Sequence, residues 1–447
     1  MGTFVPNIPA EQQEMLHAAG YRDFDDLFGG IPEEVRLKDG LSMPEGLSEM
    51  EASRHVSALA GENRVYSAIF RGAGAYDHYI PSIVGRIVRK EKFLTAYTPY
   101  QAEISQGVLQ SIFEYQSMIC QLTGMDVANA SVYDGATAAA EGAMMCLDKK
   151  RSRILVSATV SPAVRDVVKT YCFGRGVPYA EIPEEDGVTS EKALREMLTK
   201  DTAGVLIMSP NFCGNIEPAE ELGKAIHEAG AKFVLSCDPI SLGILRTPAE
   251  LGADVAVGEG QSLGMPLSFG GPYLGFMAAT TAMMRHLPGR IVGETVDHDG
   301  NRAYVLTLQA REQHIKREKA GSNICSNEAL CALTAAVYLA AVGKTGLAEI
   351  AKRCISNAHY LAGKLAEAGW QRCFEKQEFF EEFVTAAPGA DGEEAEAYAQ
   401  ALLEALDQEG ILGGLPLGNG RILWCATEKN TKADMDRVAE LAKEVRA

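Results

Sequence analysis

The chain has 447 residues, of which 47% are hydrophobic, so it can bury a large core and is not disordered as a whole. Its net charge of −18 excludes nucleic acid and an anionic membrane as main partners, because both repel an acidic surface. Its ten cysteines contain no C-x-x-C pair, and their spacing argues against a disulfide framework or a zinc site.

Residues 1–70 are predicted to form a helical N-terminal arm. One short helix spans 9–20, with a glycine at its end, and a second spans 47–62 behind a capping box of Ser48 and Glu51. An arm of this length either reaches over a neighbouring subunit or packs on its own chain, and the sequence leaves both open.

Residues 71–300 are predicted to form a large α/β domain with a doubly wound, mostly parallel sheet. A helix over 101–124 comes first, with apolar residues on one side at helical spacing. Beyond it, continuous apolar runs alternate with helix-like segments, which is typical of parallel strands covered on both faces. The runs are ANASVY, RILVS, GVLIMS, KFVLSC, VAVG and YLGFMA, and the helices between them begin at Asp134, Ser161, Ser190 and Pro218.

Residues 301–447 are predicted to form two long helices and a small C-terminal α/β domain. The helices span about 324–342 and 345–368, and the strand candidates are EFFEEFVTAA and RILWCA. An amphipathic helix from Lys432 closes the chain.

The compartment is inferred from what the sequence lacks. The N-terminus has no basic stretch followed by an apolar run, so no secretory signal is expected. The longest apolar run, 330–342, is shorter than the roughly 20 residues that cross a membrane. A cytoplasmic protein without a membrane partner is therefore expected.

Ligand sites in such sheets lie at the carboxyl ends of the strands. Those ends are predicted at 133–135, 209–211, 238–239 and 258–261. Asp238 is interpreted as the start of a turn before Pro239 rather than as a partner of a cofactor nitrogen.

Two further features are candidates for ligand contacts. Asp134 is interpreted as an ordinary helix N-cap, in preference to the start of a phosphate-binding helix. Gly270 and Gly271 either admit the close approach of a phosphate or another chain, or only form a turn before a strand.

One extended, proline-stiffened segment supplies polar and aromatic side chains. Tyr97, Thr98, Tyr100 and Gln101 form either a pocket wall or part of the core. His78 lies between an aspartate and a tyrosine, where it acts as an acid or base or is merely structural.

Gln261 and Ser262 stand where a lysine would be expected. Enzymes that use pyridoxal phosphate on a doubly wound sheet often carry, just before a glycine-rich turn, the lysine that binds the cofactor covalently. Here neither residue has an amine, and the next lysine after Asp238 is Lys316. The chain therefore has the scaffold of such an enzyme without its anchor, which points to a partner chain.

Long ordered runs of residues resemble one family closely. They include FRGAGAYDHYIPSIV, TAYTPYQAEISQGVLQSIFEYQSMICQLTGMDVANASVYDGATAAAE, SCDPISLGILRTPAELGADVAVGEGQSLGMPLSFGGPYLGF and LQAREQHIKREKAGSNICSNEAL. Together with FVPNIPAEQQEML near the start, they resemble the pyridoxal phosphate-dependent glycine decarboxylase, the P-protein of the glycine cleavage system. Within it, the chain is similar to subunit 1 of the two-chain form.

The resemblance implies a fold type I pyridoxal phosphate enzyme scaffold and a shared activity. With subunit 2, whose lysine holds the cofactor, such a chain decarboxylates glycine and passes the aminomethyl group to the lipoyl group of the H-protein. A heterotetramer is implied. The resemblance favours Tyr97, Tyr100, Gln101 and His78 as catalytic contributions of this chain.

The same resemblance favours five residues as contacts to the cofactor: Thr98, Gln261, Ser262, Gly270 and Gly271. Two alternatives stay open. One is a non-catalytic subunit that stabilises the partner and docks the lipoyl carrier. The other is an independent lyase that binds the cofactor non-covalently or through Lys316 or Lys319.

Overall fold

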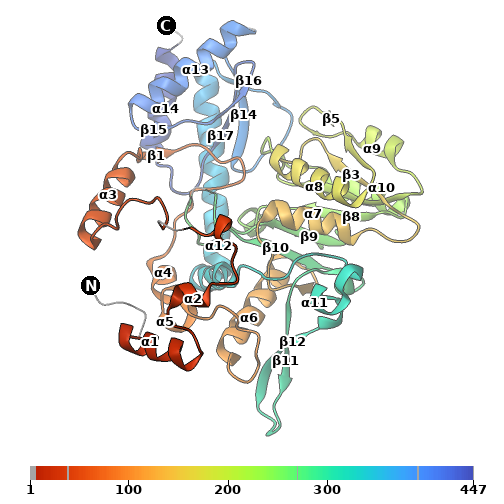
Figure 1. Ribbon diagram of the computed structural model, residues 1–447. Helices are drawn as coiled ribbons and strands as arrows, with labels where there is room; N and C mark the ends of the chain where they lie inside the picture. The colour runs from red at the N-terminus through yellow and green to blue at the C-terminus, as the bar shows by residue number, and fades with distance from the viewer. Residues whose placement is uncertain (1–6, 38–39, 269, 390–391, 446–447) are drawn as a thin grey trace. The chain divides into compact units, whose positions relative to one another are not determined.

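The computed structural model describes residues 7–37, 40–268, 270–389 and 392–445 (Figure 1). It contains two compact units, Met1–Val65 and Tyr66–Ala447. The predicted division of the chain at residues 70 and 300 stays a prediction, but the helices and strands can be compared one by one.

The first unit is mainly helical, as predicted. Its elements are α1 (Pro9–Ala18), α2 (Phe24–Leu27), the 3₁₀ turn η1 (Glu33–Val35) and α3 (Glu49–Gly61). The predicted capping box is confirmed: the Glu51 amide donates to Ser48 Oγ, and the Ser48 amide donates to Glu51 Oε2. Within the described part of this unit, Leu16 is the one buried side chain.

The second unit contains a seven-stranded sheet in the order β2-β10-β9-β8-β7-β3-β4. Neighbouring strands from β4 to β9 are parallel, and β10 is antiparallel to both of its neighbours. The strands are β2 (Val127–Ala128), β3 (Arg153–Ser157), β4 (Tyr179–Ile182), β7 (Thr202–Met208), β8 (Lys232–Ser236), β9 (Val255–Glu259) and β10 (Gly275–Ala279). The predicted doubly wound, mostly parallel sheet is confirmed.

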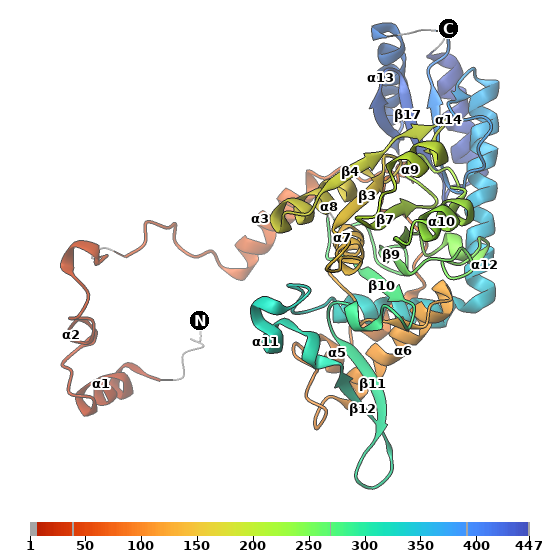
Figure 2. The same cartoon turned by 90° about the vertical axis from the view of Figure 1, so that its right-hand side faces the viewer.

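Helices cover both faces of this sheet, which is why its strands are continuous apolar runs. One face packs against α6, α10 and α12, and the other packs against α7 and α8 (Figure 2). The covering helices are α6 (Gln106–Thr123), α7 (Gly135–Met145), α8 (Pro162–Arg175), α10 (Ala219–Glu228) and α12 (Ala329–Glu367). A further helix, α9 (Glu191–Met197), follows Ser190. The four predicted helix starts are therefore confirmed, whereas α6 begins at Gln106 instead of 101.

The helix α12 joins the large sheet to the small C-terminal domain. It consists of two helices that meet at a kink at Gly343, whose φ of 60° is non-helical, so the predicted division into two helices is confirmed, although the first begins at Ala329 instead of 324. By length and composition α12 could cross a membrane, which the sequence analysis did not expect. In the structure it packs as a core helix against α6, against α14 (Lys432–Glu444) and against α4 (Ser82–Val88).

The small C-terminal domain contains a four-stranded antiparallel sheet in the order β13-β14-β17-β16. Its strands are β13 (Gln371–Arg372), β14 (Glu382–Ala386), β16 (Leu415–Gly418) and β17 (Arg421–Cys425), and α13 (Glu393–Gln408) and α14 pack on it. Both predicted strands lie in this sheet. A parallel pair, β1 (Ala68–Ile69) with β15 (Ile411–Leu412), ties the start of this unit to its end.

The remaining elements of the described chain lie around these two sheets. They are α5 (Glu91–Leu94), the hairpins β5 (Glu184–Glu185) with β6 (Val188–Thr189) and β11 (Ile291–Val296) with β12 (Arg302–Thr307), α11 (Gln313–Lys316), and the 3₁₀ turns η2 (Ser241–Gly243), η3 (Met284–His286), η4 (Gln309–Arg311) and η5 (Arg317–Lys319).

Candidate functional site

A cavity of about 270 Å³ lies at the carboxyl ends of the large sheet. Its wall includes Asp134, Asn211, Asp238 and Glu259, one from each of the four predicted strand ends. The extended segment 72–76 and the small domain, through Glu381 and Glu382, complete the wall. The cavity therefore lies where the strand ends predict a ligand site, whose use stays a prediction, and its second side comes from residues that the sequence patterns did not indicate.

The cavity is acidic. Five carboxylates line it, from Asp134, Asp238, Glu259, Glu381 and Glu382, and no Lys, Arg or His is among its described lining residues. Burial raises the pKa of Glu259 and of Glu382 to about 7. Such a wall disfavours an anionic ligand and favours a proton or a cation.

The first turn of α7 is already occupied by carboxylates. Asp134 Oδ1 accepts from the Thr137 amide at 2.7 Å, which confirms its interpretation as an N-cap. The amide of Gly135 donates to Glu259 Oε2 at 2.9 Å. A phosphate at this helix start would meet two carboxylates in place of free amides.

Gln261 is bound to the main chain and offers no amine. Its Oε1 accepts from the Tyr76 amide at 2.8 Å, and its Nε2 donates to the carbonyl oxygens of Tyr76 at 3.0 Å and Met265 at 2.8 Å. Gln261 and Ser262 are both buried. With no lysine in the described wall and the α7 amides taken, these residues do not fit covalently bound pyridoxal phosphate.

Asp238 follows β8 and begins a turn, as interpreted. Its Oδ1 accepts from the Ser241 amide at 2.7 Å, at the start of η2. Burial raises the pKa of Asp238, and nearby His78 opposes that rise.

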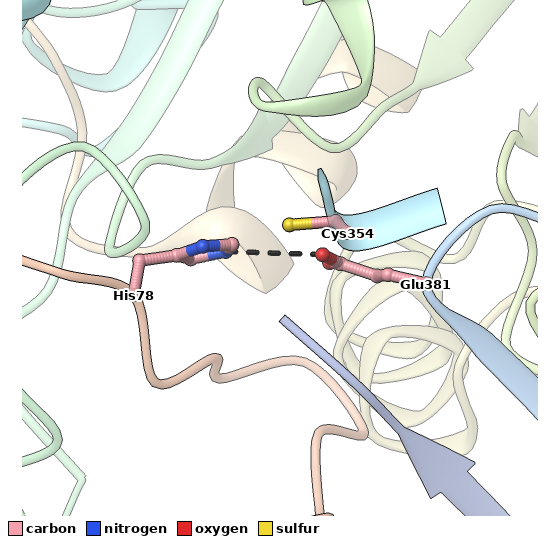
Figure 3. A group of neighbouring side chains, drawn as sticks. All are labelled: His78, Cys354 and Glu381. Carbon is pink, nitrogen blue, oxygen red and sulfur yellow. Dashed lines mark ion pairs between the residues drawn. The ribbon is translucent and has the colours of Figure 1, made fainter. Parts of the chain in front are cut away.

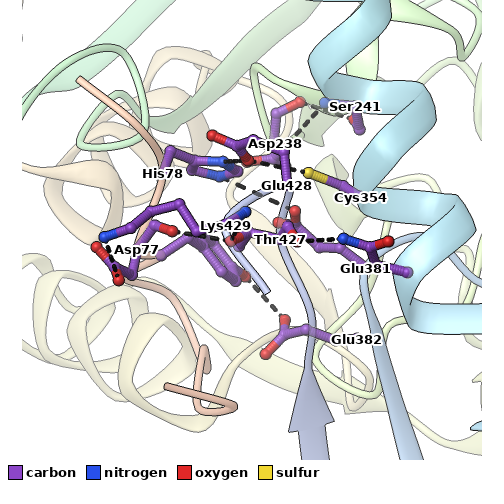
Figure 4. Close-up of polar contacts among 12 residues, drawn as sticks. Asp77, His78, Asp238, Ser241, Cys354, Glu381, Glu382, Thr427, Glu428 and Lys429 are labelled. Atoms are coloured by element: carbon purple, nitrogen blue, oxygen red, sulfur yellow. Dashed lines mark hydrogen bonds and ion pairs between the residues drawn. The ribbon is translucent and has the colours of Figure 1, made fainter. Parts of the chain in front are cut away.

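His78 is buried beside residues that the sequence analysis missed (Figure 4). Its Nδ1 lies 2.8 Å from Glu428 Oε2, and its Nε2 lies 3.9 Å from Glu381 Oε2. Cys354, on α12, completes the group. Glu381, Glu428 and Cys354 come from segments far apart in the sequence, so no local pattern could have predicted that they meet.

The segment of Tyr97, Thr98, Tyr100 and Gln101 lies between α5 and α6, and none of the four lines the cavity. Tyr97 is 93% exposed, and Thr98 and Gln101 are exposed too. Tyr100 is half-buried: its hydroxyl donates to Asn327 Oδ1 at 2.6 Å, and burial raises its pKa. The role of these four residues in a shared site stays a prediction.

The other candidates also lie outside the cavity wall. Gly270 and Gly271, with φ of 104° and 132°, form the turn before β10. Lys316 ends α11 and Lys319 ends η5. No described contact brings either lysine to the strand ends.

Comparison with known proteins places this geometry in a family. Residues 2–441 match the family model described as glycine cleavage system P-protein. A protein of Moorella thermoacetica named probable glycine dehydrogenase (decarboxylating) subunit 1 is 50% identical over 441 residues, 97% of each chain. A protein of that name from Carboxydothermus hydrogenoformans is 49% identical over 443 residues, 98% of each chain.

A comparison with solved structures agrees with this family match. A crystal structure of glycine decarboxylase (P-protein) of the glycine cleavage system, in inhibitor-bound form, superposes with a TM-score of 0.90. It is 42% identical and covers 99% of this chain and 100% of that chain. An alanine–glyoxylate aminotransferase from Nostoc sp., 16% identical, has a TM-score of 0.60 over 92% of this chain and 100% of that chain, and shares the fold alone.

Proposed function

Because the chain belongs to the glycine cleavage system P-protein family, we propose that it is the lysine-less subunit 1 of a two-chain, pyridoxal phosphate-dependent glycine decarboxylase. Together with subunit 2 it decarboxylates glycine and passes the aminomethyl group to the lipoyl H-protein. The chain acts in glycine catabolism, in the cytoplasm, within a heterotetramer.

In the proposed reaction glycine supplies the electrons and the lipoyl disulfide accepts them. The carboxylate of glycine leaves as carbon dioxide, and the remaining aminomethyl carbon forms a bond with one sulfur. The S–S bond breaks, and the other sulfur takes up a proton and becomes a thiol. Glycine is thereby oxidised and the disulfide is reduced.

The observation that carries the proposal is the position of Gln261. Its amide fastens the main chain of Tyr76 at the point where a cofactor lysine would be expected. Since the Gly135 and Thr137 amides at the start of α7 already donate to carboxylates, we place the cofactor on the lysine of subunit 2. That lysine is supplied in trans, and this chain contributes to the walls of the shared site.

The exposed segment of Tyr97, Thr98, Tyr100 and Gln101 is our candidate for that wall. Tyr97, Thr98 and Gln101 are exposed outside the chain's own cavity and can meet a partner, whereas Tyr100 is half-buried and its hydroxyl donates to Asn327. His78 is buried, so its contribution to the shared site is indirect. This chain differs from a lysine-bearing subunit at one turn, which is supported by Gln261, Ser262, Gly270 and Gly271.

The absorption spectrum with pyridoxal phosphate, before and after borohydride, tests the proposal. This chain alone is expected to give no stoichiometric reduced adduct. A mixture with subunit 2 is expected to give one, which peptide mapping places on subunit 2. A stoichiometric adduct on one lysine of this chain would overturn the proposal and support an independent enzyme.

A second measurement separates a shared site from carrier docking alone. Exchange of labelled carbon dioxide with glycine reports decarboxylation without the carrier. Variants of the exposed segment are expected to lose this exchange. If they keep it and lose only transfer to the lipoyl group, the chain is a docking subunit that does not line the site.

A further inference from the structure

His78, Cys354 and Glu381 form a compact group (Figure 3), and Glu381 also lines the cavity. One ligand atom of each, an imidazole nitrogen, a sulfur and a carboxylate oxygen, lies within 4.8 Å of the other two. All three residues are buried. They come from three segments: the extended chain before α4, the second half of α12, and the residue just before β14.

Glu381 is buried without a hydrogen-bond donor, and among the described residues its one ion-pair neighbour is His78 at 3.9 Å. It is 3% exposed, and neither of its carboxylate oxygens has a hydrogen-bond partner. Within the described residues, no Lys or Arg forms an ion pair with Glu381, Glu382 or Glu428. A bare carboxylate in such a place is strongly unfavourable, so either a proton or a metal cation must neutralise it.

The neighbouring carboxylates are satisfied by other groups. Glu382 accepts from the Ala73 amide at 2.6 Å and from the Tyr76 hydroxyl at 2.8 Å. Glu428 accepts from the Tyr79 amide at 2.7 Å. Glu428 also accepts from the Cys354 thiol at 3.4 Å, whereas neither oxygen of Glu381 has a described hydrogen-bond donor (Figure 4).

The orientation of His78 leaves a lone pair facing that carboxylate. Because Glu428 accepts a hydrogen bond, His78 carries its proton on Nδ1, which lies 2.8 Å from Glu428 Oε2. The neutral ring then has a lone pair on Nε2, which has no hydrogen-bond partner. A carboxylate that holds the far nitrogen of a histidine is the usual second partner of a metal-bound imidazole.

We propose that His78 Nε2, Cys354 Sγ and the Glu381 carboxylate bind one zinc ion. Nitrogen, thiolate and carboxylate ligands are those that Zn²⁺ takes in proteins. The protons of the Cys354 thiol and of the Glu381 carboxylic acid both leave to solvent on binding, so one thiolate and one carboxylate neutralise the two charges of the ion. Glu381 also lines the cavity, which gives the ion a route to the site.

The geometry needs the three ligand atoms, which lie within 4.8 Å of one another, to move together by up to roughly 1.2 Å. Tetrahedral zinc with bonds of about 2.0–2.3 Å holds its ligand atoms roughly 3.3–3.6 Å apart. The His78 Nε2 to Glu381 Oε2 distance is 3.9 Å, so these two side chains close by about half an ångström. The ion clamps the extended segment, α12 and the small domain together. The spacing of cysteines in the sequence could not predict this zinc site, because the site contains only one cysteine and its other two ligands come from distant segments.

Metal content and cobalt spectroscopy of the full chain test the site. The chain is produced with zinc, dialysed, and measured by elemental analysis; one equivalent per chain is expected. Replacing zinc with Co²⁺ is expected to give thiolate-to-cobalt charge-transfer bands and the visible bands of a tetrahedral ion. Zinc is also expected to raise the unfolding temperature of the metal-free chain by several degrees.

Variants and a matched control locate the ion. H78Q, C354S and E381Q are each expected to bind zinc at least tenfold more weakly, with loss of the thiolate band in C354S. C172S, which changes a buried cysteine on α8, is expected to bind like the wild type. Where a variant does not fold, the wild-type cobalt spectrum decides. A wild-type chain without a thiolate band, or a C354S chain that binds zinc unchanged, would overturn the proposal and leave a proton on Glu381.

Discussion

The side chain of Gln261 spans the main chain of Tyr76, accepting from its amide and donating to its carbonyl oxygen. Both groups lie in the second unit but are far apart in the sequence. The residue that stands in place of a lysine therefore fixes the loop that forms one wall of the acidic cavity.

Replacing Gln261 by lysine is expected to destabilise the chain without creating a cofactor site. The Tyr76 amide loses its acceptor and a charge is buried, so Q261K should lower the free energy of unfolding by about 2–3 kcal/mol. Urea unfolding measures the loss, and borohydride reduction with pyridoxal phosphate tests for an adduct. A stable Q261K chain with one stoichiometric adduct at position 261 would contradict this account.

Stability should depend on pH through Glu259. Its pKa is raised to about 7 in the folded chain, so the folded state binds more protons than the unfolded state between the two pKa values. The stability contributed by this group is therefore present at low pH and lost as pH rises through 7. Relative to E259Q, the wild type should lose about 1 kcal/mol between pH 6 and pH 8. Urea unfolding at both pH values checks it; an equal change in both proteins would disprove the role of Glu259.

The exposed segment before α6 should matter to the pair more than to the chain itself. Tyr100→Phe with Gln101→Ala is expected to lower decarboxylation by the reconstituted pair at least tenfold, while this chain loses only about 1 kcal/mol of stability with the hydrogen bond from Tyr100 to Asn327. Phe173→Ala, at an aromatic residue that is 88% exposed on α8, serves as the control and should keep full activity. Unchanged decarboxylation in the double variant would show that this segment does not line the site.

Alanine substitutions at two glycines distinguish the cost of backbone strain from the cost of a steric overlap at the cavity. Gly214 and Gly252 have φ of 85° and 84°, so alanine is strained at both. At Gly214, which lines the cavity, a Cβ would overlap the carbonyl of Glu382, whereas nothing lies within 4 Å at Gly252. G214A should therefore cost about 2 kcal/mol or more beyond G252A in denaturant unfolding. Equal losses of unfolding free energy in the two variants would mean that the small domain moves away and admits the new Cβ.

The sequence predicted the large sheet well because its strands are continuous apolar runs between clear helix starts. It did not predict β4, whose YAEI sequence is half-buried and polar at the sheet edge. It also missed the β11–β12 hairpin, which has many partly exposed residues and so lacks a continuous apolar signal. A strand could be predicted from the sequence where both of its faces are covered, because such a strand is a continuous apolar run.

The site was predictable only on the side built by the large sheet. The strand ends at Asp134, Asp238 and Glu259 follow from the topology rule for parallel sheets. Glu381 and Glu428 lie in the small domain, and their approach to His78 depends on tertiary packing between distant segments. A single sequence carries no local signal for such an encounter.

The parallel pairing of β1 with β15 has a consequence for how the chain folds. Ala68 pairs with Ile411, so one of the first segments of this unit waits for one of the last to be synthesised. The strands of the large sheet lie between 127 and 279 and can associate much earlier. We therefore expect the large sheet to assemble first during synthesis, and the small domain and the His78 cluster to close later.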